Sequence, residues 1–399
     1  MFILSVFVGF LFIAVYLLKQ SKQEEPRKIF GIYSQPGKWF LLKYYAFLLL
    51  LFVRRLKYYI FGKSFFHKES AIEKLQPLSG HKLAFDAVFF QAVTQSGIYF
   101  CVGTERRQEA KVNGLVYFLI PEYGLLLSEK LPKTTLNADP APLLSNKEYA
   151  AEGICITPVV PMKLWRISFK GKMRRLDAPD KLVNVDFQAE WRSNLPWFLA
   201  EVDVPIKILA RTIAREPWTE ELFQSLKEAH QTHYEQMGYL TGKLQIDDKV
   251  ITLTEMDAFR DHSYGYKRDW SLMHRYIFHM FYLVDKTKIS VGVICQPSTC
   301  TYLEVGFIVH PNGKMEAIDS CDLLLYQHGE NGILNKELCF TFVANGTTYE
   351  VKVNYEHDVV HYVGNDIEAK MNERFLVCEV NGIPGRGLSE WHYNNVKQN

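Results

Sequence analysis

The sequence lacks the short motifs that mark several common enzyme classes. It contains neither His-Glu-x-x-His nor Gly-x-Ser-x-Gly, and no glycine-rich loop ends in Lys-Ser or Lys-Thr. These absences remove the signatures of a zinc protease, a serine-hydrolase elbow and a phosphate-binding loop. Residues 382–387 are rich in glycine but lack the spacing of a dinucleotide fingerprint. We therefore predict a closing turn there.

Cysteine is scarce and scattered along the chain. There are 7 cysteines, at positions 101, 155, 295, 300, 321, 339 and 378, and no Cys-x-x-Cys pair. An odd number at irregular spacing does not indicate a disulfide framework or a common zinc site. His230 and His233 are three residues apart, but no third ligand stands at a suitable spacing. We expect buried thiols, no metal and no cofactor.

The chain as a whole has little net charge, but its N-terminal region is strongly basic. The formal net charge is +2, whereas residues 1–68 hold 11 basic and 2 acidic residues. The remainder is acidic, with 35 basic and 42 acidic residues. A basic, apolar N-terminal region suits contact with anionic lipid headgroups, and an acidic body lacks the basic face that nucleic acid requires. We predict membrane lipid as a partner and exclude nucleic acid.

Long apolar runs occur near the N-terminus. Residues 2–18 form a run of 17 residues that is broken only by Ser5, Gly9 and Tyr16, which is the lower limit for spanning a bilayer. Basic residues follow this run and no small-residue cleavage site is present, so a signal peptide is disfavoured. We predict a single-pass transmembrane helix within an anchor and juxtamembrane segment, residues 1–66, with the body in the cytosol. A second stretch, residues 39–53, could span, which would move the body across the membrane, or lie in the interface.

The body, from residue 71 onward, alternates apolar and polar residues with a period of two. In residues 163–170, Trp165, Ile167 and Phe169 share one face, as expected of a half-buried strand. Further strands are expected at 97–104, 114–120, 123–128, 182–191, 249–254, 274–284, 288–295, 301–309, 337–343, 349–355 and 373–380. Many short strands separated by turns predict an all-β barrel or sandwich.

Residues 215–238 break this alternation. Apolar residues recur there at helical spacing, with Pro217 near the start and Gly238 just past the end. The pattern predicts a connecting helix at 215–238 between two β-units, at 71–214 and 239–399.

Residues 259–270 collect the side chains best suited to chemistry. Asp261 and His262 are adjacent, and a carboxylate can fix the tautomer of a histidine or raise its pKa. In a strand, however, adjacent side chains point to opposite faces. The segment is therefore either a polar cluster at an apolar cavity or a structural knot of hydrogen bonds and ion pairs.

The string from Arg260 to Gly265, Arg-Asp-His-Ser-Tyr-Gly, resembles the Asp-His-x-(Trp/Tyr)-Gly signature of the carotenoid hydratase (hydroxyneurosporene synthase)-like family. Residues 162–174 and 233–236 also resemble an uncharacterised branch that includes the N-terminal regions of animal phosphoenolpyruvate synthase-like proteins. The resemblance covers roughly residues 80–395 and implies two consecutive lipocalin-like antiparallel β-barrels. It also implies, for the enzymes of the family, chemistry on polyene substrates held inside the barrel.

These observations predict a membrane-anchored protein that encloses an apolar small molecule, such as a lipid or isoprenoid, in a β-barrel cavity. One alternative is an enzyme that hydrates, isomerises or cyclises such a molecule, with Asp261 or His262 as proton donor or acceptor. The other alternative is a non-catalytic scaffold. The candidate ligand-binding residues are Arg260, Tyr264, Arg268, Trp270, Trp165, Arg166 and Tyr234, although a hydrophobic core is the favoured place for Trp165 and Trp270.

Overall fold

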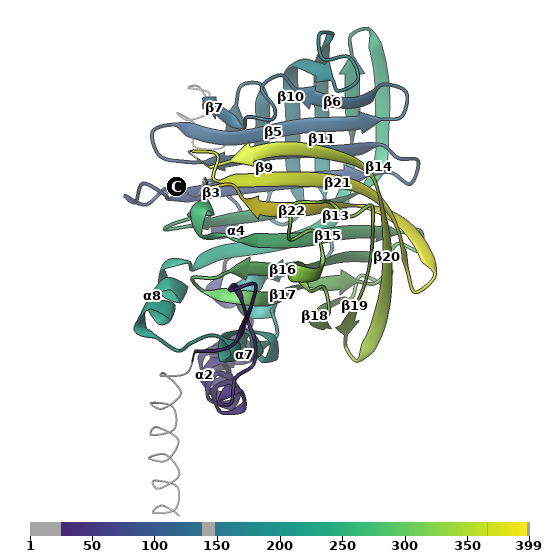
Figure 1. The fold of residues 1–399 in the computed structure, drawn as a ribbon. Coiled ribbons are helices and arrows are strands. Elements are labelled where there is room, and N and C mark those ends of the chain that lie inside the picture. The colour runs from purple at the N-terminus through teal and green to yellow at the C-terminus, as the bar shows by residue number, and fades with distance from the viewer. Residues whose placement is uncertain (1–24, 138–147, 365, 397–399) are drawn as a thin grey trace, which may run out of the picture.

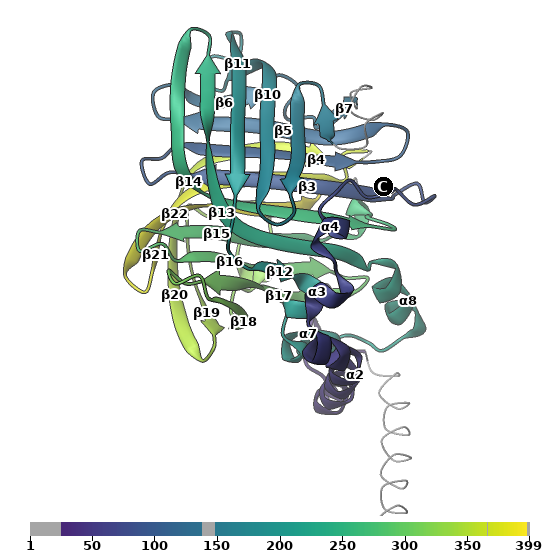
Figure 2. The same cartoon turned by 180° about the vertical axis from the view of Figure 1, so that it is seen from behind.

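The computed structural model describes residues 25–137, 148–364 and 366–396. Two large antiparallel sheets make up most of this part of the chain, and they lie side by side (Figures 1 and 2). Most of the helices lie at one end of the molecule (Figures 1 and 2). The predicted all-β class with two strand-rich units is confirmed.

The first sheet closes on itself through eight of its strands. β10 pairs with both β6 and β11, and β14 pairs with both β13 and β3, so the path of pairing returns to its start. The eight are β3 (Phe85–Val93), β4 (Tyr99–Arg106), β5 (Lys111–Ile120), β6 (Gly124–Ser128), β10 (Leu164–Arg175), β11 (Leu182–Arg192), β13 (Gln231–Ile246) and β14 (Lys249–Gly265). Four short strands add to its margins: β7 (Thr135–Asn137), β8 (Tyr149–Ala151), β9 (Ile154–Val160) and β12 (Trp197–Leu199).

The second sheet is a closed barrel of consecutive strands. Its last strand pairs with its first, in the register Tyr276 opposite His392 and Leu283 opposite Gly385. The strands are β15 (Arg275–Leu283), β16 (Lys288–Gln296), β17 (Cys300–Val309), β18 (Met315–Cys321), β19 (Glu337–Ala344), β20 (Thr347–Val363), β21 (Ala369–Val380) and β22 (Ile383–Asn394).

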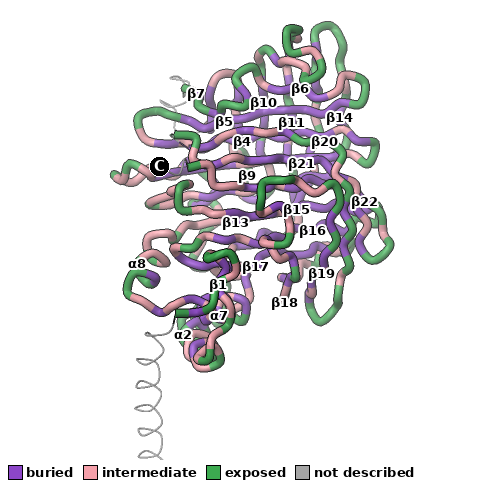
Figure 3. Tube along the Cα trace, viewed as in Figure 1, coloured by how far each residue is buried: buried purple, intermediate pink, exposed green. Residues whose placement is uncertain are grey.

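Alternation along the strands explains how both sheets acquire a core. In β10, Trp165, Ile167 and Phe169 are buried, whereas Arg166 and Lys170 point to solvent. The inside of the first sheet is filled by a cluster that includes Phe90, Phe100, Phe118, Phe187 and Trp191. A second cluster fills the barrel and extends into the junction between the sheets. Figure 3 shows this burial along the strands and exposure at the turns that join them.

The two sheets are joined by direct contacts across their outer faces. The rings of Tyr99 and Phe375 lie 4.7 Å apart, and the Tyr99 hydroxyl donates to the Leu376 carbonyl at 2.9 Å. Lys288 of β16 forms a buried ion pair with Asp257 of β14. β3, β4, β5 and β14 therefore face the second barrel.

The predicted helix at 215–238 is too long. The observed helix α8 (Glu220–Glu228) begins after Thr219, whose hydroxyl accepts from the Leu222 amide at 3.2 Å, and strand β13 begins at Gln231. Residues 231–237 read as helical, but β13 is hydrogen-bonded to β14 on one side and to β11 and β12 on the other, which satisfies its backbone as a strand. Consequently the chain changes sheets between Gly265 and Arg275, whereas the sequence pattern placed the start of the second unit at 239.

The remaining helices lie before the first sheet and between β12 and β13. Among the described residues, no helix combines the length and the apolar character needed to cross a bilayer. The predicted transmembrane helix at residues 2–18 lies outside the described part of the chain. Residues 39–53 lie almost entirely in helix α2 (Phe40–Phe61). Besides α2 and α8, the described α-helices are α3 (Lys63–Phe66), α4 (Glu69–Ile72), α6 (Ala200–Asp203) and α7 (Ile206–Arg215).

Candidate functional site

Strand β14 divides the sequence signature between two faces of the first sheet. Arg260 and His262 point inward and are fully buried, whereas Asp261 points outward toward the second barrel. This is the result expected of neighbours in a strand. Asp261 and His262 therefore belong to two different environments, and they do not form an acid–base pair with each other.

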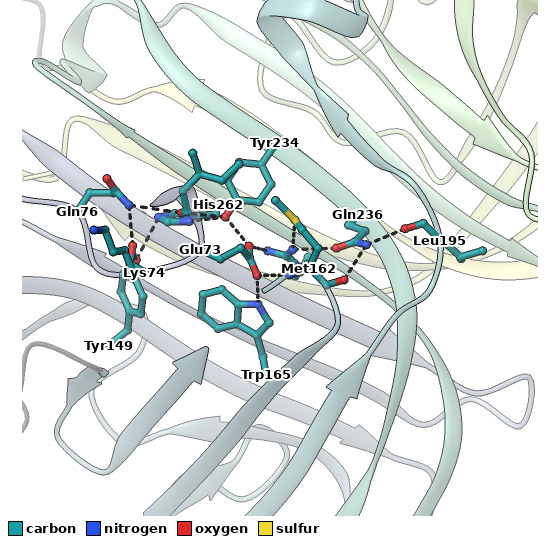
Figure 4. Close-up of polar contacts among 12 residues, drawn as sticks. Glu73, Lys74, Gln76, Tyr149, Met162, Trp165, Leu195, Tyr234, Gln236 and His262 are labelled. Carbon is teal, nitrogen blue, oxygen red and sulfur yellow. Dashed lines mark hydrogen bonds and ion pairs between the residues drawn. The ribbon is translucent and has the colours of Figure 1, made fainter. Parts of the chain in front are cut away.

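The inward face is a closed network of polar side chains, shown in Figure 4. His262 Nε2 lies 2.7 Å from Asp86 Oδ1, and His262 Nδ1 lies 2.7 Å from the Tyr234 hydroxyl. The same Tyr234 hydroxyl donates to Glu73 Oε1 at 2.5 Å, and Tyr149 approaches His262 Nε2 at 3.1 Å. Both imidazole nitrogens are thus occupied by protein groups inside a packed sheet.

Glu73 and Arg260 extend this network toward the aromatic core. Arg260 donates to Glu73 at 2.7 Å and to Gln236 at 2.8 Å, and Trp165 Nε1 donates to the second Glu73 oxygen at 2.7 Å. Burial acts to raise the pKa of Glu73, but Arg260 and the Tyr234 hydrogen bond outweigh it and lower that pKa. The arrangement is a buried network of hydrogen bonds around the Glu73–Arg260 ion pair, which is typical of a structural role.

Two further predicted residues lie apart from one another. Arg166 is on the outer face of β10, where its side chain is 66% exposed and pairs with Glu190 at 3.4 Å. Tyr264 is half-buried near the end of β14, with its ring 5.1 Å from the His262 ring. Arg166 therefore meets none of the other predicted residues, whereas Tyr264 borders the network.

A cavity of about 400 Å³ lies on the outward face, between the first sheet and the second barrel. Asp261, Arg268 and Trp270 line it, so the structure brings these three predicted residues together. Much of the wall is apolar and comes from both sheets, including Ala87, Phe89, Leu115, Phe259, Phe278, Met280 and Met371. Helix α8 and the segment 267–273 close one side.

Two pairs of carboxyl groups face this cavity from opposite walls. Glu235 of β13 stands directly opposite Asp261 of β14, and Glu373 of β21 stands directly opposite Glu390 of β22. Like charges in such cross-strand positions repel each other. Among the described residues, no N–H or O–H group donates to either oxygen of Glu373, which leaves this buried carboxyl without a neutralising donor. The geometry therefore favours retention of protons at these pairs.

The pKa values of these carboxyls follow from their surroundings. Burial raises the pKa of Glu235 to about 7, although the Ser290 hydroxyl donates to it at 2.8 Å. Burial and the neighbouring Glu235 raise the pKa of Asp261 well above its ordinary value. Burial and repulsion from Glu390 do the same for Glu373. Near neutral pH the cavity thus presents carboxyl groups that can donate a hydrogen bond or a proton.

Two basic side chains at the same cavity, Arg268 and His233, lie close to polar side chains of neighbouring strands. Arg268 donates to Gln231 at 2.9 Å and to the Ser263 hydroxyl at 2.8 Å. His233 Nε2 lies 3.8 Å from a Glu235 oxygen and 4.0 Å from an Asp261 oxygen. Burial, together with the charge of Arg268, lowers the pKa of His233 to about 3, so its imidazole is neutral at physiological pH. Together, a neutral imidazole and two protonatable carboxyls make a set capable of acid–base chemistry.

Sequence reasoning missed most of this set. Glu235 and His233 fell within the predicted helix, and Glu373 and Glu390 lie in strands that carry no recognisable motif. The available signal was the alternation in residues 231–237, where Tyr234 and Gln236 face inward and Glu235 faces outward. As for metals, no group of three His, Cys, Asp or Glu side chains in the described ranges could hold one.

A family model matches residues 2–393, and it describes a family of unknown function (DUF8627). The chain belongs to this family. The family model bears no carotenoid-hydratase name, so the finer resemblance inferred from the β14 signature remains a prediction. A search of curated proteins found no match.

Several solved structures are similar to this chain at low sequence identity. A candidate AttH protein from Nitrosomonas europaea is 9% identical, with a TM-score of 0.51, over 79% of this chain and 94% of that chain. CghA is 10% identical, with a TM-score of 0.48, over 79% and 90%. Kievitone hydratase from Nectria haematococca is 12% identical, with a TM-score of 0.42, over 81% and 94%. The first of these similarities supports a common fold, and at such identity none of them extends to activity.

Proposed function

We propose that this protein encloses an apolar small molecule, a lipid or an isoprenoid-like compound, in the cavity between its two sheets. The observation that carries the proposal is the cavity of about 400 Å³, whose wall exposes more apolar than polar surface although about half of its lining residues are polar or charged. Small-molecule sites have this size and combine apolar surface with polar groups that orient the ligand. The sequence prediction placed the ligand inside a barrel, but buried aromatic side chains fill the inside of the first sheet.

The carboxyl pairs support an enzyme as the second candidate. A general acid works best when its pKa is near the working pH, and the pKa of Glu235 is about 7. In a hydration, Glu235 or Asp261 would transfer its proton to an alkene carbon. Water would then add to the carbocation and return a proton to the carboxylate. Isomerisation or cyclisation needs the same first step, after which a proton is lost from a different carbon.

The predicted anchor forms part of the same proposal. Residues 2–18 would hold the body at a membrane, on the cytosolic side, next to a supply of apolar ligand. The third alternative, a scaffold without a ligand, requires the cavity to stay empty of anything apolar.

Mass spectrometry of organic extracts from the purified chain tests ligand binding. We expect an apolar compound in extracts of the native chain and its loss from Ala87→Phe, which places a ring in the cavity. Val250→Phe, at an exposed position outside the cavity, is the matched control and should retain the compound. An extract without any apolar compound, combined with no uptake of a fluorescent fatty acid, would reject the binding proposal in favour of the scaffold.

The enzyme candidate requires a separate comparison. Incubation with a polyene or isoprenoid extract should yield a new product with the native chain. Glu235→Gln and Asp261→Asn should lose the product yet still take up the compound. Uptake without conversion by the native chain would exclude the enzyme candidate and leave the binding protein.

A further inference from the structure

Helix α2 has an inverted distribution of polar and apolar side chains. Lys43 and Arg55 are 1% and 5% exposed, whereas Leu49 and Ile60 are each 64% exposed. A helix on a water-facing surface buries its apolar stripe and exposes its charges. α2 lies at the end of the molecule beside α7 (Figures 1 and 2), and large apolar side chains, among them Leu41 and Leu49, are exposed on it. On α2 the basic side chains are buried and the apolar ones are exposed, which is the opposite of this arrangement.

The inward orientation of the two basic residues is fixed by specific hydrogen bonds. Lys43 Nζ donates to the Glu216 carbonyl at 3.1 Å, at the C-terminal end of α7. Arg55 donates to the carbonyls of Val204 at 2.5 Å and Glu201 at 2.7 Å, at the end of α6. The C-terminal end of a helix presents free carbonyls and a partial negative charge, which attract cations. These contacts set the rotation of α2 about its axis.

The opposite side of α2 is consequently a continuous apolar surface. Its members recur every three or four residues, so they share one side of the helix. We define the outer face of α2 as Leu41, Tyr45, Leu49, Val53, Leu56 and Ile60, all of which are at least 44% exposed. Phe61, the last residue of the helix, and Phe65 and Phe66 beyond it are also exposed. An exposed apolar patch of this kind marks a contact with a membrane or another protein.

The charges around this face point to an anionic membrane. α2 contains no acidic residue, Arg54 and Lys57 are exposed on it, and Lys57 lies at the border of its outer face. Lys38 and Lys68 are exposed just outside its two ends. Residues 1–68 as a whole hold 11 basic and 2 acidic residues. Two copies of such a basic face would repel each other, whereas anionic headgroups would attract it.

We propose that the outer face of α2 docks on an anionic lipid bilayer, with the helix axis in the membrane plane. The apolar side chains would enter the boundary between headgroups and acyl chains, and Lys57 would contact lipid phosphates. Tyrosine and phenylalanine rings at this depth are typical of interfacial segments. This docking surface is separate from the cavity, and it is distinct from the predicted anchor at residues 2–18.

Photo-crosslinking to lipid tests this surface in the full chain. The chain is incorporated into vesicles of phosphatidylcholine with about 30% phosphatidylserine and a phospholipid that carries a diazirine on its acyl chain. After illumination, mass spectrometry locates the adducts. We expect adducts on the outer face of α2, at Leu49, Val53 or Ile60. Adducts confined to residues 2–18 would overturn the proposal.

Matched variants separate docking from mere proximity to the anchor. The double substitution Leu49→Glu/Val53→Glu should lower the α2 adducts by about tenfold, because two carboxylates would have to enter the interface. Ile333→Glu, at a position that is 68% exposed and lies outside α2, should leave the amount of α2 adducts unchanged. Circular dichroism would show that both variants fold. Equal labelling of α2 in native and double-variant chains would refute the proposal, as would a stable dimer that the double variant dissociates.

Discussion

Replacement of Glu235 by glutamine should change how stability depends on pH. The Glu235 carboxyl is buried in the folded chain with a pKa of about 7, compared with an ordinary value of 4.5. Below pH 4.5 it is protonated in both the folded and the unfolded chain. Between pH 4.5 and 7 the unfolded chain releases this proton while the folded chain retains it, so native stability falls as the pH rises. Glutamine has no proton to lose, and the variant therefore lacks this part of the loss.

The size of the effect follows from the two pKa values. Each factor of ten between them corresponds to about 1.4 kcal/mol, so the full effect is about 3 kcal/mol. About 2 to 3 kcal/mol of this falls between pH 5 and pH 8. Because the Glu235 side chain is only 5% exposed, solvent screening reduces this value little.

Urea unfolding of native chain and Glu235→Gln at pH 5 and at pH 8 measures this difference. Relative to the native chain, the variant should gain about 2 to 3 kcal/mol in free energy of unfolding between these pH values. Glu337→Gln, at an exposed glutamate in β19, provides the control and should show no such gain. If Glu235→Gln changes stability by the same amount at both pH values, Glu235 is ionised in the folded chain and our account of the cavity is wrong.

Three further predictions concern the network, the helix cap and the topology. Arg260→Ala should lower the free energy of unfolding by about 3 to 5 kcal/mol, because it leaves Glu73 buried without its cation; a loss below 1 kcal/mol in urea titration would contradict the knot. Thr219→Ala removes the bond to the Leu222 amide and should cost about 1 kcal/mol in the same titration, against no change if α8 needs no cap. Asn345 begins a glycosylation sequon, Asn345-Gly346-Thr347, and it should stay unglycosylated in eukaryotic cells if the body is cytosolic as predicted; a mobility shift on endoglycosidase treatment would place the body outside the cytosol.

Alternation along the sequence was sufficient to predict most strands. The segment 163–170 appears in β10 with the expected faces, and the segments 288–295 and 337–343 correspond closely to β16 and β19. The pattern failed at 231–237, where residues spaced like a helix form a strand that pairs with β12 on one side and β14 on the other. Pairing with these strands overrode the local preference there, and single-sequence reasoning has no access to such pairing.

The candidate site shows the same limit more strongly. That Asp261 and His262 point to opposite faces follows from the geometry of any strand, and the structure agrees. Asp261 lies more than 100 residues before Glu373 and Glu390 along the chain. These carboxyls face the same cavity only because the two sheets pack against each other. Nothing in the local sequence around β21 or β22 indicates a cavity. The inverted face of α2 was likewise visible only as a hydrophobic stretch with a lysine inside it.

Helix α8 connects two regions that have otherwise been considered separately. Phe47 of α2 packs against Trp218, with ring centroids 6.1 Å apart, and Trp218 packs with Leu222 of α8. Ser225, Glu228 and Ala229, at the other end of α8, form part of the cavity wall. Under the proposed docking, a tilt of α2 on a curved or crowded bilayer would press on this short helix, whose far end forms part of the cavity wall. Helix α8 is thus the element that would couple the proposed membrane-docking face to the proposed ligand cavity.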